Sequence, residues 1–169
     1  MTKLRLTGGE PLIRKDIVEI VHRLRTHFPE LDLALTTNGT LLAPVAKDLK
    51  SAGLNRLTVS IDSVDARRFQ LLTRRDQLAS VSAGIEAAHE AEFDSLKLNA
   101  LLFNGIQKEA PKLLKLAADY NAELRFIEYM DVGGATQWSS NHLINGASFR
   151  ESLRSDFGEL ESLERAYGD

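Results

Sequence analysis

Apolar and polar positions follow two different periods along this chain. Short apolar stretches, typical of β-strands, are followed by longer stretches in which apolar residues recur at helical spacing. The predicted strands are Leu4–Leu6, Leu31–Thr36, Arg56–Ile61, Leu96–Phe103 and Glu123–Tyr129. Helices are predicted over 16–28, 44–52, 65–72, 78–92 and 109–120, with a final helix from residue 148. Pro44 would lie in the first turn of its helix, Ser148 would cap the last helix, and 131–145 would form a loop.

The regular alternation of strand and helix predicts the architecture. Five βα units in series favour a parallel sheet with right-handed crossovers. Either a doubly wound sheet or a barrel satisfies that pattern. The polar residues within the strands favour the barrel, because strands covered on both faces would be almost continuously apolar.

One face of the predicted strands is repeatedly polar. Side chains alternate between the two faces of a strand, and the polar set on one face is Arg5, Thr7, Thr36, Asn38, Thr58, Ser60, Asp62, Lys97, Asn99 and Arg125. Each residue alone has a structural explanation, since threonine favours strands and an edge strand can expose lysine. The set as a whole favours a binding face, near the strand ends where parallel α/β folds place their sites. Its chemistry suits an anionic ligand such as a nucleotide.

The loop after the first strand reads Gly8-Gly9-Glu10-Pro11. Two glycines let the backbone approach a ligand without interference from Cβ atoms. A tight turn with Glu10 near a helix start explains the same residues. The chain has neither the P-loop pattern nor the Rossmann glycine pattern.

Composition narrows the classes of function. The chain has 169 residues, a formal net charge of −3 and no cysteine. Disulfides, thiolate metal sites and cysteine-ligated iron–sulfur clusters are therefore excluded for these residues. The charge gives no basic field for nucleic acid, and we found no apolar run of membrane-spanning length and no signal peptide, so we expect a cytoplasmic protein without nucleic-acid or membrane partners. The four histidines show no metal-ligand spacing, and we expect no metal site.

Several motifs occur in order at characteristic spacing. They are LRLTGGEPL at 4–12, LTTNG at 35–39, VSIDS at 59–63, KLN at 97–99 and RFIEYM at 125–130. The first resembles a signature of radical S-adenosylmethionine (radical SAM) enzymes. Together the motifs resemble the GTP 3',8-cyclase family of molybdenum cofactor biosynthesis, clearly over residues 4–132.

The resemblance implies a fold and a reaction. The fold would be a partial parallel β/α barrel of the radical SAM type, with about five βα units. Residues 1–132 would form the barrel core, and residues 133–169 a loop and helix leading toward a C-terminal cluster region. Such enzymes use S-adenosylmethionine and 4Fe–4S clusters to convert GTP to the cyclised pterin precursor, a lyase reaction.

The same resemblance assigns roles by position. Gly9, Ser60 and Met130 would bind S-adenosylmethionine. Arg5, Thr36 and Lys97 would bind GTP, and all three belong to the polar strand face. No catalytic residue is assigned.

The chain departs from the family in its lack of cysteine. In the family, cluster cysteines lie before the Gly-Gly-Glu-Pro loop and again near the C-terminus. We therefore expect this chain to be an inactive piece of such an enzyme, with self-association through an open barrel edge. The alternatives are a cluster-free nucleotide-binding or regulatory protein, and a barrel enzyme that uses Lys97 or Glu128 as acid or base.

Overall fold

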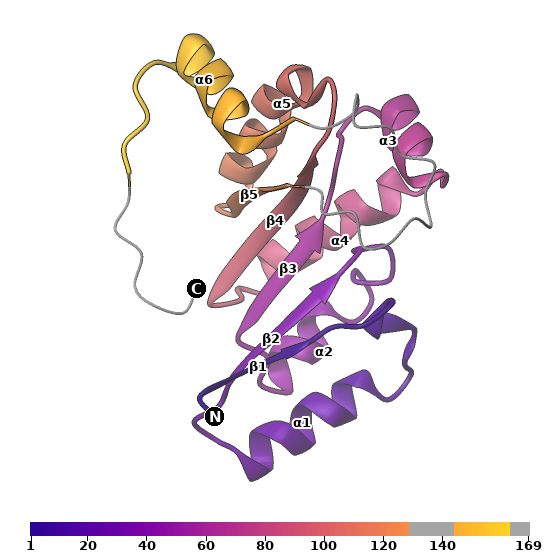
Figure 1. Ribbon diagram of the computed structural model, residues 1–169. Coiled ribbons are helices and arrows are strands. Elements are labelled where there is room, and N and C mark those ends of the chain that lie inside the picture. The colour runs from indigo at the N-terminus through magenta and orange to yellow at the C-terminus, as the bar shows by residue number, and fades with distance from the viewer. Residues whose placement is uncertain (129–143, 163–169) are drawn as a thin grey trace.

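Five parallel strands form one sheet in the order β1-β2-β3-β4-β5 (Figure 1). The computed structural model describes residues 1–128 and 144–162. The strands are β1 (Lys3–Leu6), β2 (Asp32–Thr37), β3 (Arg56–Ser60), β4 (Ser95–Leu102) and β5 (Glu123–Glu128). All five strands were predicted from the sequence, although residue 129, the predicted end of the fifth, lies outside the described residues.

A helix or helical pair connects each strand to the next. The helical elements are η1 (Pro11–Ile13), α1 (Ile17–His27), α2 (Ala46–Ser51), α3 (Ala66–Thr73), α4 (Leu78–Glu90), α5 (Ile106–Asp119) and α6 (Gly146–Phe157). Consecutive strands are neighbours throughout, and right-handed crossovers then place the connecting helices on one face of the sheet. Figure 1 shows α2, α4 and α5 together on that face.

The strand order distinguishes between the two predicted architectures. A doubly wound sheet reverses its direction of growth at a switch point, whereas this sheet grows in one direction only. The chain therefore has the partial β/α barrel fold that the sequence favoured. Its helix-covered face forms the core, in which alternate strand residues such as Leu35, Leu57 and Leu98 are fully buried. The opposite, inner face carries the polar residues.

Two helix starts differ from the prediction. Pro44 precedes α2, whose N-cap is Val45, instead of lying in the first turn. Ser148 is inside α6, and the cap is Asn145, whose Oδ1 accepts a hydrogen bond from the Ser148 backbone N–H at 2.8 Å. An asparagine oxygen caps a helix by reaching the N–H of the third helical residue, so Ser148 is the recipient of the cap. The predicted loop at 131–145 falls largely outside the described residues.

The two edges of the sheet differ. At β5, Phe149 of α6 is buried and its ring lies 4.6 Å from that of Phe126. At the other edge, β1 pairs with β2 alone among the described strands. Self-association through that edge, and the division of the chain at residue 132, remain predictions.

Within the described ranges, no helix is long and apolar enough to cross a membrane.

Candidate functional site

A cavity of about 500 Å³ lies on the inner face of the sheet. It is lined by Lys3, Leu4, Arg5, Ala34, Thr36, Arg56, Thr58, Asn99 and Arg125. We call it the inner-face cavity. Four of these described residues are cationic and none is a carboxylate, so the lining is complementary to an anion. The volume falls within the range of small-molecule sites, roughly 300–1,000 Å³.

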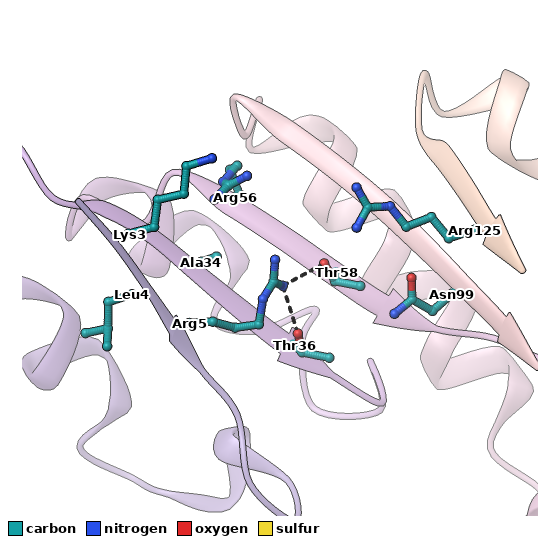
Figure 2. A pocket seen from close by; sticks show the side chains of 9 residues that line it. All are labelled: Lys3, Leu4, Arg5, Ala34, Thr36, Arg56, Thr58, Asn99 and Arg125. Carbon is teal, nitrogen blue, oxygen red and sulfur yellow. Dashed lines mark hydrogen bonds between the residues drawn. The ribbon is translucent and has the colours of Figure 1, made fainter. Parts of the chain in front are cut away.

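Arg5 lies between the strands at the middle of this cavity (Figure 2). Its Nη1 donates hydrogen bonds to Thr36 Oγ1 at 3.0 Å and to Thr58 Oγ1 at 3.2 Å. Burial, followed by the charges of Arg56 and Arg125, lowers the pKa of the Arg5 guanidinium. Burial and the two neighbouring arginines thus disfavour the charged guanidinium at this position, and the charge of Asp32 partly offsets them.

Arg56 is fixed at the amino-terminal end of the cavity. Its Nε lies 2.9 Å from Asp32 Oδ1 and its Nη2 lies 2.7 Å from Asp32 Oδ2. This two-bond pairing sets the plane of the guanidinium, the geometry that suits arginine to carboxylates and phosphates. Figure 2 shows Lys3 and Arg56 on the same side of the cavity, with Arg125 on the opposite side.

Asn99 adds an unsatisfied polar group to the same lining. Its Oδ1 is buried without a hydrogen-bond partner among the described residues, and the residue lines the cavity beside Thr58. A buried amide oxygen without a partner is costly. This amide is therefore the polar group of the lining whose hydrogen-bonding capacity the described residues leave unused.

Lys97 is on the inner face but does not line the cavity. In the sheet it pairs with Thr58 on one side and with Glu123 on the other. The side chain is only 6% exposed, and its Nζ lies 3.0 Å from Glu123 Oε2. The structure therefore brings Arg5 and Thr36 together, whereas it directs the Lys97 ammonium to a carboxylate on β5.

A second cavity, of about 480 Å³, lies at the carboxyl ends of β1, β2 and β3. Its lining is Gly9, Glu10, Ile13, Asn38, Thr40, Ser60, Asp62, Phe69, Thr73, Arg75 and Gln77. We call it the strand-end cavity. Both described residues expected to bind S-adenosylmethionine, Gly9 and Ser60, line it. Met130 lies outside the described residues.

The backbone of the glycine loop is not packed against other residues, and Gly9 lines the strand-end cavity. Gly8 has φ +151°, a conformation that other residues rarely adopt, and a Cβ added to Gly8 or Gly9 would meet nothing within 4 Å. The positive φ accounts for Gly8, whereas neither packing nor backbone conformation accounts for Gly9, where a closely approaching ligand would favour a residue without a Cβ. The Oε1 atom of Gln77, in the same lining, is buried without a hydrogen-bond partner in the described part of the chain. Open backbone and an unpaired polar atom fit a polar ligand such as S-adenosylmethionine.

Glu10 and Asp62 shape the strand-end cavity through the backbone. Glu10 caps η1 by accepting a hydrogen bond from the Leu12 N–H at 3.0 Å, which agrees with the alternative explanation of this loop as a turn with Glu10 near a helix start. Asp62 Oδ1 accepts a hydrogen bond from the Leu101 N–H at 2.8 Å, just beyond the paired part of β3. Burial raises the pKa of Asp62, against the lowering effect of that hydrogen bond.

The site prediction missed residues whose signal was in the sequence. Lys3 and Arg56 have the same strand parity as Arg5 and Thr58, and both line the inner-face cavity. Thr58, Asn99 and Arg125 were assigned to the polar face but to no ligand. The acid–base alternative gains no support, because Lys97 pairs with Glu123 and Glu128 accepts a hydrogen bond from the Gly146 N–H.

A one-directional parallel sheet with a cationic inner face and a glycine-lined strand-end cavity defines an α/β barrel-type ligand-binding protein. The chain belongs to the radical SAM superfamily, whose family model matches residues 2–117. It is 43% identical to a GTP 3',8-cyclase 1 of Mycobacterium tuberculosis over 170 aligned residues, covering 98% of this chain and 47% of the relative. A GTP 3',8-cyclase of Paenarthrobacter nicotinovorans is 47% identical over 156 residues, covering 92% of this chain and 44% of the relative. The chain thus spans about half the length of these relatives.

Solved structures agree on the fold. Streptococcus suis SuiB bound to S-adenosylmethionine superposes with a TM-score of 0.73 at 14% identity, covering 91% of this chain and 35% of that one. The coproporphyrinogen III oxidase HemN of Escherichia coli, a radical SAM enzyme, superposes with a TM-score of 0.70 at 16% identity, covering 92% of this chain and 39% of that one. The superfamily implies S-adenosylmethionine and a 4Fe–4S cluster as cofactors. The present chain has no cysteine to ligate such a cluster.

Proposed function

We propose that this chain is the GTP- and S-adenosylmethionine-binding part of a GTP 3',8-cyclase, the lyase that forms the cyclised pterin precursor of the molybdenum cofactor. The observation that carries the proposal is the cluster of four cations in the inner-face cavity, on a chain whose relatives are named GTP 3',8-cyclases along almost its whole length. A nucleoside triphosphate meets that lining with complementary charge.

Arg5 and Thr36 are the proposed centre of the GTP site. Their mutual hydrogen bond of 3.0 Å fixes the guanidinium between β1 and β2. Arg56 and Lys3 would receive phosphate oxygens toward the strand starts, and Arg125 would receive them from β5. Lys97 belongs to the same site by family position, although its ammonium now contacts Glu123.

The strand-end cavity is the proposed S-adenosylmethionine site. Backbone groups of Gly9 would hold the amino acid end of the ligand, and the Ser60 hydroxyl would bond to it from the end of β3. Bound there, S-adenosylmethionine supplies the 5'-deoxyadenosyl group. Ser60 and Asn99 are register partners on adjacent strands and line different cavities, so the two ligands would lie near one another.

The residues of this chain do not fit an iron–sulfur cluster. The sequence contains no thiolate ligand, and the described part of the chain holds no cluster of three or more histidine, aspartate or glutamate side chains placed for a metal ion. We assign no step to a cluster held by this chain. That mismatch favours a second candidate function, a cluster-free nucleotide-binding or regulatory protein, which would use the inner-face cavity alone.

Two variants test the proposal by affecting the two cavities separately. Arg5→Gln should weaken GTP binding at least about tenfold, because a charge-assisted bond is lost, and leave S-adenosylmethionine binding unchanged. Ser60→Leu should fill part of the strand-end cavity. It should therefore weaken S-adenosylmethionine binding and leave GTP binding unchanged. Isothermal titration of each variant with both ligands measures the four affinities. If Arg5→Gln leaves GTP affinity unchanged, the GTP site is wrong; GTP binding without any S-adenosylmethionine binding would favour the cluster-free alternative.

A further inference from the structure

Glu123 is the carboxylate that occupies two cations of the inner face. It begins β5 directly opposite Lys97 in the sheet register. Its Oε1 lies 2.6 Å from Arg125 Nε, and its Oε2 lies 3.0 Å from Lys97 Nζ. Each carboxylate oxygen therefore contacts one cation, so a single negative charge is shared between two positive charges. Lys97 itself is not part of the cavity lining.

Lys97 and Glu123 differ in their exposure to solvent. The Lys97 side chain is 6% exposed, whereas that of Glu123 is 50% exposed. A buried ammonium without a partner carries a large desolvation cost, so Lys97 requires an anion at all times. Glu123 can turn into water at little cost. The Glu123 carboxylate is therefore the side chain that another anion can replace at Lys97.

Glu123 is charged in this arrangement. Burial acts to raise the pKa of Glu123, but the hydrogen bonds from Arg125 and Lys97 outweigh it, and the net effect lowers the pKa. The inner face is thus partly neutralised by its own carboxylate at neutral pH. Any phosphate that reaches Lys97 or Arg125 competes with a group already bonded to both.

We propose that Glu123 is an internal counter-anion that the phosphate chain of the ligand displaces from Lys97 and Arg125. This inference rests on the proposed triphosphate site and assigns it a residue that limits anion affinity. In the empty state Glu123 satisfies the buried Lys97. When a polyphosphate arrives, Glu123 turns outward and both cations bond to phosphate oxygens. Monovalent anions gain little, because Lys97 and Arg125 already have a carboxylate of equal charge.

The test uses inorganic triphosphate as the probe, titrated calorimetrically into the whole chain and its variants. Glu123→Gln should bind triphosphate about tenfold more tightly than the parent, because the competing charge-assisted bonds are removed. Glu19→Gln is the matched control, because it removes the same charge from a pair with Arg23 on the surface of α1. It should leave the affinity unchanged. Equal gains in both variants would show a net-charge effect and overturn the inference.

A double variant locates the gain at Lys97. If Glu123 competes for that ammonium, adding Lys97→Met to Glu123→Gln should abolish most of the tenfold gain. Unchanged or weaker triphosphate binding in Glu123→Gln would mean that Glu123 positions the cations, and the inference would be wrong. Failure of the parent to bind triphosphate at all would overturn the proposed site as well, so the two failures are distinguishable.

Discussion

Thr37 donates a hydrogen bond from its Oγ1 to Glu10 Oε1 at 2.7 Å, joining the end of β2 to the glycine loop that follows β1. The other carboxylate oxygen, Oε2, accepts the Asn38 N–H at 2.7 Å. One side chain thus connects two strand ends at the rim of the strand-end cavity. The shape of that cavity depends on a bond between residues far apart in the sequence.

Replacing Glu10 should therefore loosen the rim. Glu10→Gln keeps the size of the side chain but turns one acceptor into a donor that faces the N–H or O–H of its partner. We expect the free energy of unfolding to fall by about 1–3 kcal/mol, the typical cost of leaving such groups unpaired. Urea denaturation measures it. The exposed Glu19→Gln should cost much less, and equal losses in the two variants would contradict the role given to Glu10.

Gly84 of α4 marks a close contact between a helix and the loop after β2. A Cβ added to Gly84 would lie 2.5 Å from the carbonyl oxygen of Gly39 and 3.1 Å from Leu42 Cβ. Gly84→Ala should therefore be destabilising by about 1–3 kcal/mol, although alanine favours helices over glycine. Thermal unfolding compares it with Ser82→Ala, which changes an exposed position of the same helix. A Gly84→Ala protein as stable as Ser82→Ala would show that the contact is not tight.

Asp62 predicts a pH dependence of stability. Burial raises the pKa of its carboxyl group above the ordinary value of 3.8. The folded state then binds the proton more tightly than the unfolded state, so this contribution to stability is fully present below 3.8 and is lost as the pH rises through the folded pKa. Asp62→Asn keeps an oxygen for the Leu101 N–H without the buried charge. At neutral pH the Asp62→Asn protein should be at least as stable as the parent. The difference in free energy of unfolding between the two proteins should become smaller as the pH falls.

Urea unfolding at a series of pH values measures that difference. Asp119→Asn, which removes an exposed carboxylate paired with Lys115, reports the background effect of a lost surface charge. A parent protein clearly more stable than Asp62→Asn at neutral pH would mean that the hydrogen bond from Leu101 outweighs burial, contrary to this account.

The strands and the polar inner face were predictable because both follow from a period of two. Thr58 alternates with the buried Leu57 and Val59. Arg5 and Arg125 alternate with apolar residues that are partly buried against the core, and the alternation alone places all three polar side chains on one face. The one-directional strand order was favoured for the same reason, since a polar face is incompatible with helices on both sides.

Other features depend on three-dimensional partners that no local pattern reveals. Glu123 reads as an ordinary first residue of a strand, and only the β4–β5 register places it opposite Lys97. The capping role of Asn145 depends on the direction of its side chain relative to the Ser148 N–H. Lys3 and Arg56, by contrast, were overlooked although the period of two places them on the polar face with Arg5 and Thr58, and both line the inner-face cavity.

The most direct measurement of the central claim compares GTP with guanosine by isothermal titration of the native chain. If the cations of the inner-face cavity hold the triphosphate, GTP should bind at one saturable site, guanosine should bind at least about a hundredfold more weakly, and added salt should weaken only GTP. Guanosine binding as tightly as GTP, or GTP binding that is insensitive to salt, would contradict a triphosphate site on this face.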